Sequence, residues 1–287
     1  MAFAKKGDVF VPEIFIEAIQ AGFSGVEVMD KTGAVIFNSQ MPYSQGNVGS
    51  SVTIPYFGNI GELEDLVADG DALTPRGVTT TQETATVSHS GIAIEATWWA
   101  QASASSDPYA EMARQALVAI KRRAFKGVVD ECNTNANMLE LDVTGSSLKL
   151  DYDVMIDAKL KFGDEDGDIA ALVVHSKTKA DLRKLKTSTG VPLFIDGING
   201  DVDRFTGIPV FTSDRMRVSG ANYTSLVLKR NAVLFWMNGA PIVLTDKDIL
   251  ANSDVQAMHI YWAVHPYKRL PGMTKPGVCR IIHKVGS

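Results

Sequence analysis

The feature that most limits how this chain can fold is a sharp change of pattern near residue 100. Residues 77–98 are dense in threonine, valine and isoleucine and alternate with a period of two, which is typical of a half-buried strand. Residues 52–58, VTIPYFG, indicate a shorter strand upstream. The two runs together predict a long two-stranded β-arm.

An acidic, turn-rich segment joins the two strands of the arm, and no neighbouring element in the sequence would cover the arm's apolar face. Residues 59–75, NIGELEDLVADGDALTP, join the two strands. A lone two-stranded hairpin is marginal in water, and neither a helix nor a third strand lies nearby in the sequence. We therefore expect a neighbouring subunit to cover the apolar face of the arm. Trp98 and Trp99 end the second run; in a strand one ring would pack inward and the other could serve an interface, while core packing of both is an equal alternative.

One long helix follows the arm. Asp107 suits the N-cap, Pro108 suits the first helical position, and Glu111 in the first turn suits the helix dipole. Apolar residues then recur at spacings of three and four, at Met112, Ala116, Leu117, Ile120, Ala124, Val128 and Cys132. The pattern predicts a helix from Pro108 to about Cys132, on the order of 36 Å long at about 1.5 Å per residue.

The segments before the arm and after the helix predict shorter elements. Residues 13–22 predict a short amphipathic helix, and residues 26–42 predict extended chain. Beyond Asn137 the pattern predicts a mixed α/β region with helices at 152–162 and 177–187. Strands are expected at 168–176 and 206–216, twice within 223–246, and at 256–270 and 277–285.

Composition excludes several classes of protein. The formal net charge is −5 and the pI is about 5.6, which argues against a dedicated nucleic-acid binder but not against a shell that encloses nucleic acid. Cys132 and Cys279 lack metal-like spacing, so two reduced, packed thiols are expected. No apolar run reaches the roughly 18 residues of a membrane helix, and none resembles a signal peptide. We expect a soluble protein made in a cytoplasm.

Two aspartate-rich turns invite comparison with cation sites. In the run GDEDGDI, Asp164, Asp166 and Asp168 stand at alternate positions, as oxygen ligands do at the start of a calcium loop. The twelfth loop position, where such a loop needs glutamate, is His175. We therefore favour a solvated turn over a weak cation site. A turn is also the better interpretation of IDGINGDVDR, with its Asp196, Asp201 and Asp203.

No catalytic signature stands out. The chain has five histidines, which are His89, His175, His259, His265 and His283. None pairs with another at a helical metal-ligand spacing, and the sequence has no HExxH, GxSxG, GxGxxG or Walker-type loop. A pair of acids that meets only in the fold stays open. No catalytic, cofactor-binding or metal-binding residue is predicted, and the chain is not expected to be an enzyme.

In order and spacing, these elements resemble the major capsid proteins of tailed bacteriophages, which have the Hong Kong 97-type shell fold. Residues 49–100 look like that family's extended E-loop, and residues 107–132 look like its long spine helix. The run ALVVHSKTKADLRKL is similar to an A-domain segment of the family, and GIPVFTSDRM is similar to a later strand. The closing strands are similar over NAVLFWMNGAPIVL, AMHIYWAVHPYKRL and PGVCRII.

The resemblance implies an α+β fold with four parts. They are an N-arm at 1–49, an E-loop at 50–99, a P-domain at 100–135 and 242–269, and a mixed α/β A-domain at 136–241 and 270–287. It also implies a major capsid protein of the virion, assembled in the host cytoplasm into pentamers and hexamers of an icosahedral shell. That shell would enclose double-stranded DNA without sequence-specific binding and would carry a portal.

The sequence departs from some members of that family. Some members cross-link covalently through a lysine of the E-loop, but no lysine lies between Lys31 and Lys121, so no such cross-link is expected. Other members begin with a charged helical segment that acts as a scaffold. This chain begins almost directly with the arm, so a separate scaffolding protein is expected, and a decoration protein is compatible with the resemblance.

The resemblance motivates an assembly hypothesis. The acidic tip of the arm comprises Glu62, Glu64, Asp65, Asp69 and Asp71. The second half of the long helix is basic, with Lys121, Arg122, Arg123 and Lys126. We expect the tip of one subunit to lie near the basic helix of another, with two solvated faces as the alternative. Each exposed pair would contribute about 0–1 kcal/mol. Apolar burial by the N-arm and the β-arm should contribute more, so removal of residues 1–40 should leave soluble, assembly-poor protein.

Two other functions compete with the viral capsid. An encapsulin-type nanocompartment shell has the same fold and encloses protein cargo. A stand-alone α/β enzyme would instead be a monomer or a small oligomer with a concave polar pocket.

Overall fold

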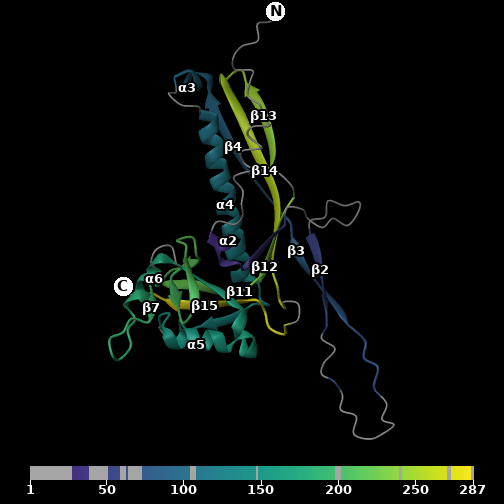
Figure 1. Cartoon of the computed structure of the whole chain (residues 1–287). Helices are drawn as coiled ribbons and strands as arrows, with labels where there is room; N and C mark the ends of the chain where they lie inside the picture. The colour runs from purple at the N-terminus through teal and green to yellow at the C-terminus, as the bar shows by residue number, and fades with distance from the viewer. Residues whose placement is uncertain are drawn as a thin grey trace, which may run out of the picture.

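The computed structural model describes residues 28–38, 51–58, 63, 73–103, 108–146, 148–197, 202–238, 241–269 and 273–285. Figure 1 shows a sheet along one long helix, a second sheet with helices at the C-terminal end of that helix, and an arm that projects away from both. Among the described residues the first sheet has five strands, the second has eight and the arm has two.

The five-stranded sheet is built on β14 (Ser253–Pro266). β12 (Val233–Met237) and β13 (Ile242–Asp248) both pair antiparallel with β14. β12 pairs with its C-terminal part and β13 with its N-terminal part. β4 (Ser88–Thr97) pairs antiparallel along its other edge. β1 (Val35–Asn38) runs parallel beside β12.

The long helix α4 (Pro108–Thr134) covers one face of this sheet, and its predicted extent is confirmed. Its apolar side packs in one core with Met258, Ile260 and Trp262 of β14. A Cβ atom at Gly127 would lie 2.4 Å from the Trp262 ring, so the missing side chain lets the helix approach the sheet closely. The Arg123 guanidinium carbon lies 4.9 Å from the centroid of the same ring.

The second sheet has a core of its own. Its strands are β5 (Leu139–Asp142), β15 (Val278–Lys284), β11 (Asn222–Lys229), β6 (Ile169–Val174), β9 (Ile208–Thr212), β8 (Arg204–Phe205) and β7 (Phe194–Ile195), in that order, with β10 (Val218–Ser219) beside β11. Helices α5 (Tyr152–Leu160) and α6 (Ser176–Lys184) contribute buried side chains to this core. Both helices were expected from the sequence, as were β6, β9, β14 and β15.

A buried ion pair lies where the chain passes from the second sheet, at the end of β11, to the first, at β12. The side chain of Lys229 is fully buried, and its Nζ lies 2.8 Å from Oε2 of Glu165, in the short 3₁₀ segment η1 (Gly163–Asp168). The backbone amide and the hydroxyl of Thr274 also donate to Glu165. Burial alone would raise the pKa of Glu165, but the Lys229 ammonium and the Thr274 donors outweigh it and lower the pKa to about 2. The carboxylate is therefore charged at neutral pH.

The arm differs from its prediction in two ways. The run at 77–98 is two strands: β3 (Thr80–Thr86) pairs with β2 (Ser51–Phe57), whereas β4 pairs with β14. The base of the arm is also covered by its own chain. Val52, Ile54 and Ala85 pack with Leu234, Trp236 and Ala263 of the five-stranded sheet. The expectation that the cover comes from outside is therefore wrong for the base.

Three smaller predictions need correction. Trp98 and Trp99 begin a helix, α3 (Trp98–Ser103), and are 42% and 79% exposed, so neither is a strand or core residue. Part of the expected extended chain at 26–42 is helical, at α2 (Val28–Thr32). The stretch 223–246 contributes to three strands, because a break after Met237 separates β12 from β13. The helix predicted at 13–22 lies outside the described residues.

Candidate assembly surfaces

Polar contacts fix the base of the arm to the five-stranded sheet. The Tyr56 hydroxyl of β2 lies 2.5 Å from Nε2 of His265 in β14, and the same Nε2 lies 3.3 Å from Oε2 of Glu83 in β3. His265 is 3% exposed, and burial lowers its pKa to about 4. Burial and the Glu83 carboxylate raise the pKa of Tyr56. At neutral pH the imidazole is therefore neutral, and its Nε2 can accept a hydrogen bond from the Tyr56 hydroxyl.

The segment after β14 strengthens this joint. The Arg269 guanidinium donates to the carbonyl oxygen of Phe57, the last residue of β2. Lys268 Nζ lies 4.0 Å from Oε1 of Glu83, and the Tyr267 ring meets the Tyr56 ring edge-on at 6.1 Å between centroids. A cavity of about 440 Å³ lies beside these groups. Contacts from both strands therefore set the direction in which the arm leaves the body.

The outer part of the arm has apolar side chains without cover. Phe57, Leu63, Leu73 and Val78 are all exposed within the described part of the chain. Apolar side chains at the end of a projecting element mark it as a contact surface. The expectation of an outside cover therefore still applies to this outer part.

The structure describes only one side of the predicted contact between the acidic tip and the basic half of α4. The acidic tip residues Glu62, Glu64, Asp65, Asp69 and Asp71 all lie outside the described residues. The basic residues lie on α4, where Lys121 is half-buried and Arg122, Arg123 and Lys126 are exposed. Arg123 already packs on Trp262. The pairing of tip and helix stays a prediction.

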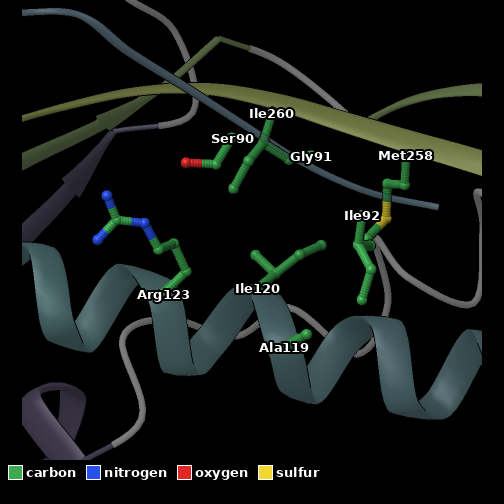
Figure 2. Close-up of a pocket in the computed structure, with 8 residues that line it drawn as sticks. All are labelled: Ser90, Gly91, Ile92, Ala119, Ile120, Arg123, Met258 and Ile260. Atoms are coloured by element: carbon green, nitrogen blue, oxygen red, sulfur yellow. The ribbon is translucent and has the colours of Figure 1, made fainter.

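A largely apolar groove lies between α4 and the adjoining strands. Figure 2 shows Ala119, Ile120 and Arg123 of the helix facing β4 and β14 across a pocket of about 340 Å³. The indole N–H of Trp262 donates to the Ser90 hydroxyl at 3.0 Å, which ties the two strands together at this point. The strands contribute Ser90, Gly91, Ile92, Met258 and Ile260 to the lining.

The aspartate-rich turns lie at ion pairs, which Glu165, Asp196 and Asp203 form. Asp164, Asp166 and Asp168 lie in η1 around Glu165, which binds Lys229. Lys179 pairs with Asp203, and Arg183 pairs with Asp196 at 2.6 Å; Asp201 lies outside the described residues. Within the described ranges no three His, Cys, Asp or Glu side chains gather as a metal site would require.

Histidine contacts were missed by the sequence reasoning. His89 Nε2 lies 3.1 Å from His259 Nδ1, and His265 joins the arm to β14. These residues are far apart in sequence and meet only because β4 pairs with β14 and β2 packs on the sheet. These contacts depend on the register of the strands, and the alternation of apolar and polar residues along one strand does not specify that register.

Two further expectations concern thiols and membranes. Cys132 and Cys279 are free and buried, as expected, and burial raises the pKa of each to about 12. No described helix is long and apolar enough to cross a bilayer.

Comparisons with known proteins agree with the fold. The chain is 24% identical over 283 residues to the major capsid protein of Bacillus phage SPP1, covering 93% of this chain and 86% of that one. The capsid of an empty GTA particle matches with a TM-score of 0.66 at 14% identity, over 92% of this chain and 91% of that one. The SrpI encapsulin of Synechococcus elongatus matches with a TM-score of 0.58 at 14% identity, over 74% and 79%. The fold is of the Hong Kong 97 type.

Residues 7–235 match the model of the family described as "Phage capsid family". That match covers most of the chain and includes the arm, the long helix and most of the second sheet. This chain belongs to the phage capsid family.

Proposed function

We propose that this chain is the major capsid protein of a tailed bacteriophage, and that its copies form the pentamers and hexamers of an icosahedral shell around double-stranded DNA. The family match over residues 7–235 is the observation that carries the proposal. The projecting arm supports it, because its outer apolar residues find no cover in the described part of their own chain. A second copy is the natural source of that cover.

Size and particle shape test the proposal. The full-length chain should elute far above monomer mass and give capsomers or closed particles in electron micrographs. A chain that stays monomeric at every concentration tried and also forms no particles in infected cells would contradict the proposal and revive the enzyme alternative. The structural role of the family supports the proposal that the chain is not an enzyme.

The encapsulin-type shell remains the second candidate because an encapsulin shares the fold. Particle contents separate the two functions. Nuclease-resistant DNA in particles purified from infected cells is expected for the capsid, whereas a bound protein cargo without DNA is expected for the nanocompartment.

The division into N-arm (1–49), E-loop (50–99), P-domain (100–135 and 242–269) and A-domain (136–241 and 270–287) is part of the proposal. The core that the second sheet forms with α5 and α6 supports an A-domain, whereas the core beneath α4 also takes in Val173, Leu226, Leu228 and Val278 of that sheet. The five-stranded sheet also contains β1, β4 and β12, which lie outside the two P-domain ranges, β4 within the range of the E-loop.

Further partners and the site of assembly complete the proposal. A shell filled with DNA needs an entry point, so we include a portal, together with a separate scaffolding protein and room for a decoration protein. The protein would reside in the virion after assembly in the host cytoplasm. Pairing of the acidic arm tip with the basic half of α4 belongs to the same proposal.

A further inference from the structure

Helix α5 has an apolar side that the fold does not use. Val154, Met155 and Ala158 point into the core of the second sheet and are buried. On the other side, Tyr152, Ile156 and Leu160 recur every four residues and are 43%, 45% and 74% exposed. Residues spaced by four lie on one side of a helix, so these three form a continuous surface. We call them the α5 stripe.

The stripe is unusual for the solvent side of a surface helix. Such a helix normally has polar residues opposite its core side. Here polar residues only flank the apolar ones: Asp153 and Asp157 are both exposed. A contiguous apolar surface with a charged border is typical of a protein–protein contact.

A second surface on the same sheet combines exposed apolar side chains with basic ones, where the α5 stripe has acidic ones. Val191 and Ile195 are 58% and 62% exposed, in the segment after α6 and in β7. Lys184 and Lys186 beside them are exposed; Lys184 lies 3.5 Å from Asp181 of its own helix. We call these four residues the α6 patch. β7 is at one edge of the sheet, and β5, from which the chain leads to α5, is at the opposite edge.

We propose that the α5 stripe of one subunit packs on the α6 patch of a second copy of this chain. The inference rests on the proposed function, in which copies form closed rings. A ring requires two different, complementary surfaces on each subunit, and these two surfaces match in apolar content and in sign of charge. In this contact the carboxylates of Asp153 and Asp157 face the ammonium groups of the α6 patch.

Removing the apolar character of the stripe tests the contact. The variant Ile156→Gln/Leu160→Gln keeps the helix and the net charge, and both side chains are exposed, so the subunit should fold normally. We expect the subunit concentration at half assembly to rise at least tenfold. The control Lys161→Gln/Asp164→Gln changes two exposed neighbours without changing the net charge and should assemble as the wild type does. Assembly of the stripe variant at the wild-type concentration overturns the inference.

A charge exchange tests the identity of the partner surface. Asp157→Lys should weaken assembly, and adding Lys186→Asp should restore it, because the opposite charges again face each other. Failure of the exchange to restore assembly overturns the choice of the α6 patch.

Footprinting of the wild-type chain gives an answer that does not depend on how a variant folds. Hydroxyl radicals should oxidise Tyr152 and Leu160 in free subunits at least fivefold faster than in assembled material. Equal oxidation in both states overturns the inference. If the wild type never assembles, the proposed function fails; if it assembles and the stripe stays reactive, only this inference fails.

Discussion

At the residue scale, His265 is a basic side chain kept neutral at the joint between the arm and the sheet. It faces Tyr56 of β2, Glu83 of β3 and Tyr267, and Lys268 lies on the far side of Glu83. Burial lowers its pKa to about 4 from 6.5. Protonation would place a buried imidazolium against the apolar base of the arm. The joint is therefore strongest when the imidazole is neutral.

This environment predicts a loss of stability in mild acid. Between pH 6.5 and about 4 the unfolded chain binds the proton at this histidine and the folded chain does not, so stability falls as pH decreases. At about 1.4 kcal/mol per pKa unit, the contribution is on the order of 3 kcal/mol. The free energy of unfolding, measured with urea on subunits at pH 7 and at pH 4.5, should differ less between the two pH values for His265→Gln than for the wild type.

The matched control is His89→Gln, because His89 is exposed. It should retain the wild-type pH dependence. A His265→Gln subunit that loses as much stability between the two pH values as the wild type does would contradict the argument. His283, whose pKa burial also lowers, accounts for part of the dependence that remains.

The ion pair of Lys229 and Glu165 gives a second prediction at this scale. Glu165→Gln leaves the fully buried ammonium of Lys229 without a counter-ion, which should cost about 3–5 kcal/mol. The double variant Glu165→Gln/Lys229→Met removes both charges and should be more stable than the single variant. Because the pKa of Glu165 is lowered to about 2, the wild type should lose this contribution as pH falls from 4.5 to about 2.

Urea unfolding at pH 7 compares these variants with the exposed neighbour Asp166→Asn, which should behave as the wild type does. Equal stability of the single and double variants would mean that the ammonium is not held by Glu165. In that case the loss would come from Glu165's other contacts with Thr274.

At the element scale, local signals predicted some elements well and long-range pairing decided others. The N-terminal Asp-Pro signal and the spacing of apolar residues predicted α4, because both act within a few turns of one helix. Alternation predicted strand character at 77–98. It could not predict that the run divides at Val87, because the partner of its second half, β14, lies more than 150 residues away.

The contact of α4 with the sheet predicts the effect of filling Gly127. Alanine favours a helix by about 1 kcal/mol over glycine. Its Cβ would nevertheless lie 2.4 Å from the buried Trp262 ring, and overpacking of this kind costs about 1–3 kcal/mol. Gly127→Ala should therefore lower the midpoint of urea unfolding. Gly167→Ala, where a Cβ meets nothing within 4 Å, is the control and should not. A Gly127→Ala subunit more stable than the wild type would contradict the close packing.

The N-terminal arm requires a different truncation from the one that the sequence suggested. Removal of residues 1–40 would also remove β1 and the buried Met29 and Ala34. Removal of residues 1–27 leaves every described element in place. We expect this shorter truncation to give folded subunits by circular dichroism that assemble poorly by sedimentation. Particles formed as readily as by the full chain would exclude a strapping role for the removed segment.

At the scale of the whole molecule, the order of elements was predictable and their joints were not. The sequence indicated an arm, a long helix and a mixed α/β region, and the two cores and the projecting arm agree with that order. The joints depend on contacts between distant segments, such as Tyr56 with His265 and Lys229 with Glu165. No local pattern specifies such contacts, because they follow from sheet register and from burial.

The distribution of charge over the molecule gives the last prediction. If the acidic arm tip contacts the basic half of α4 in a neighbouring copy, then Glu64→Lys/Asp65→Lys should impair assembly while the subunit still folds. Reversal of two exposed helix residues in the same chain, Arg122→Glu/Lys126→Glu, should restore it in part. The control Asp164→Lys/Asp166→Lys makes the same change of net charge elsewhere. Light scattering during assembly compares the three variants with the wild type, and normal shells from the first variant would show that the tip and the helix are merely solvated.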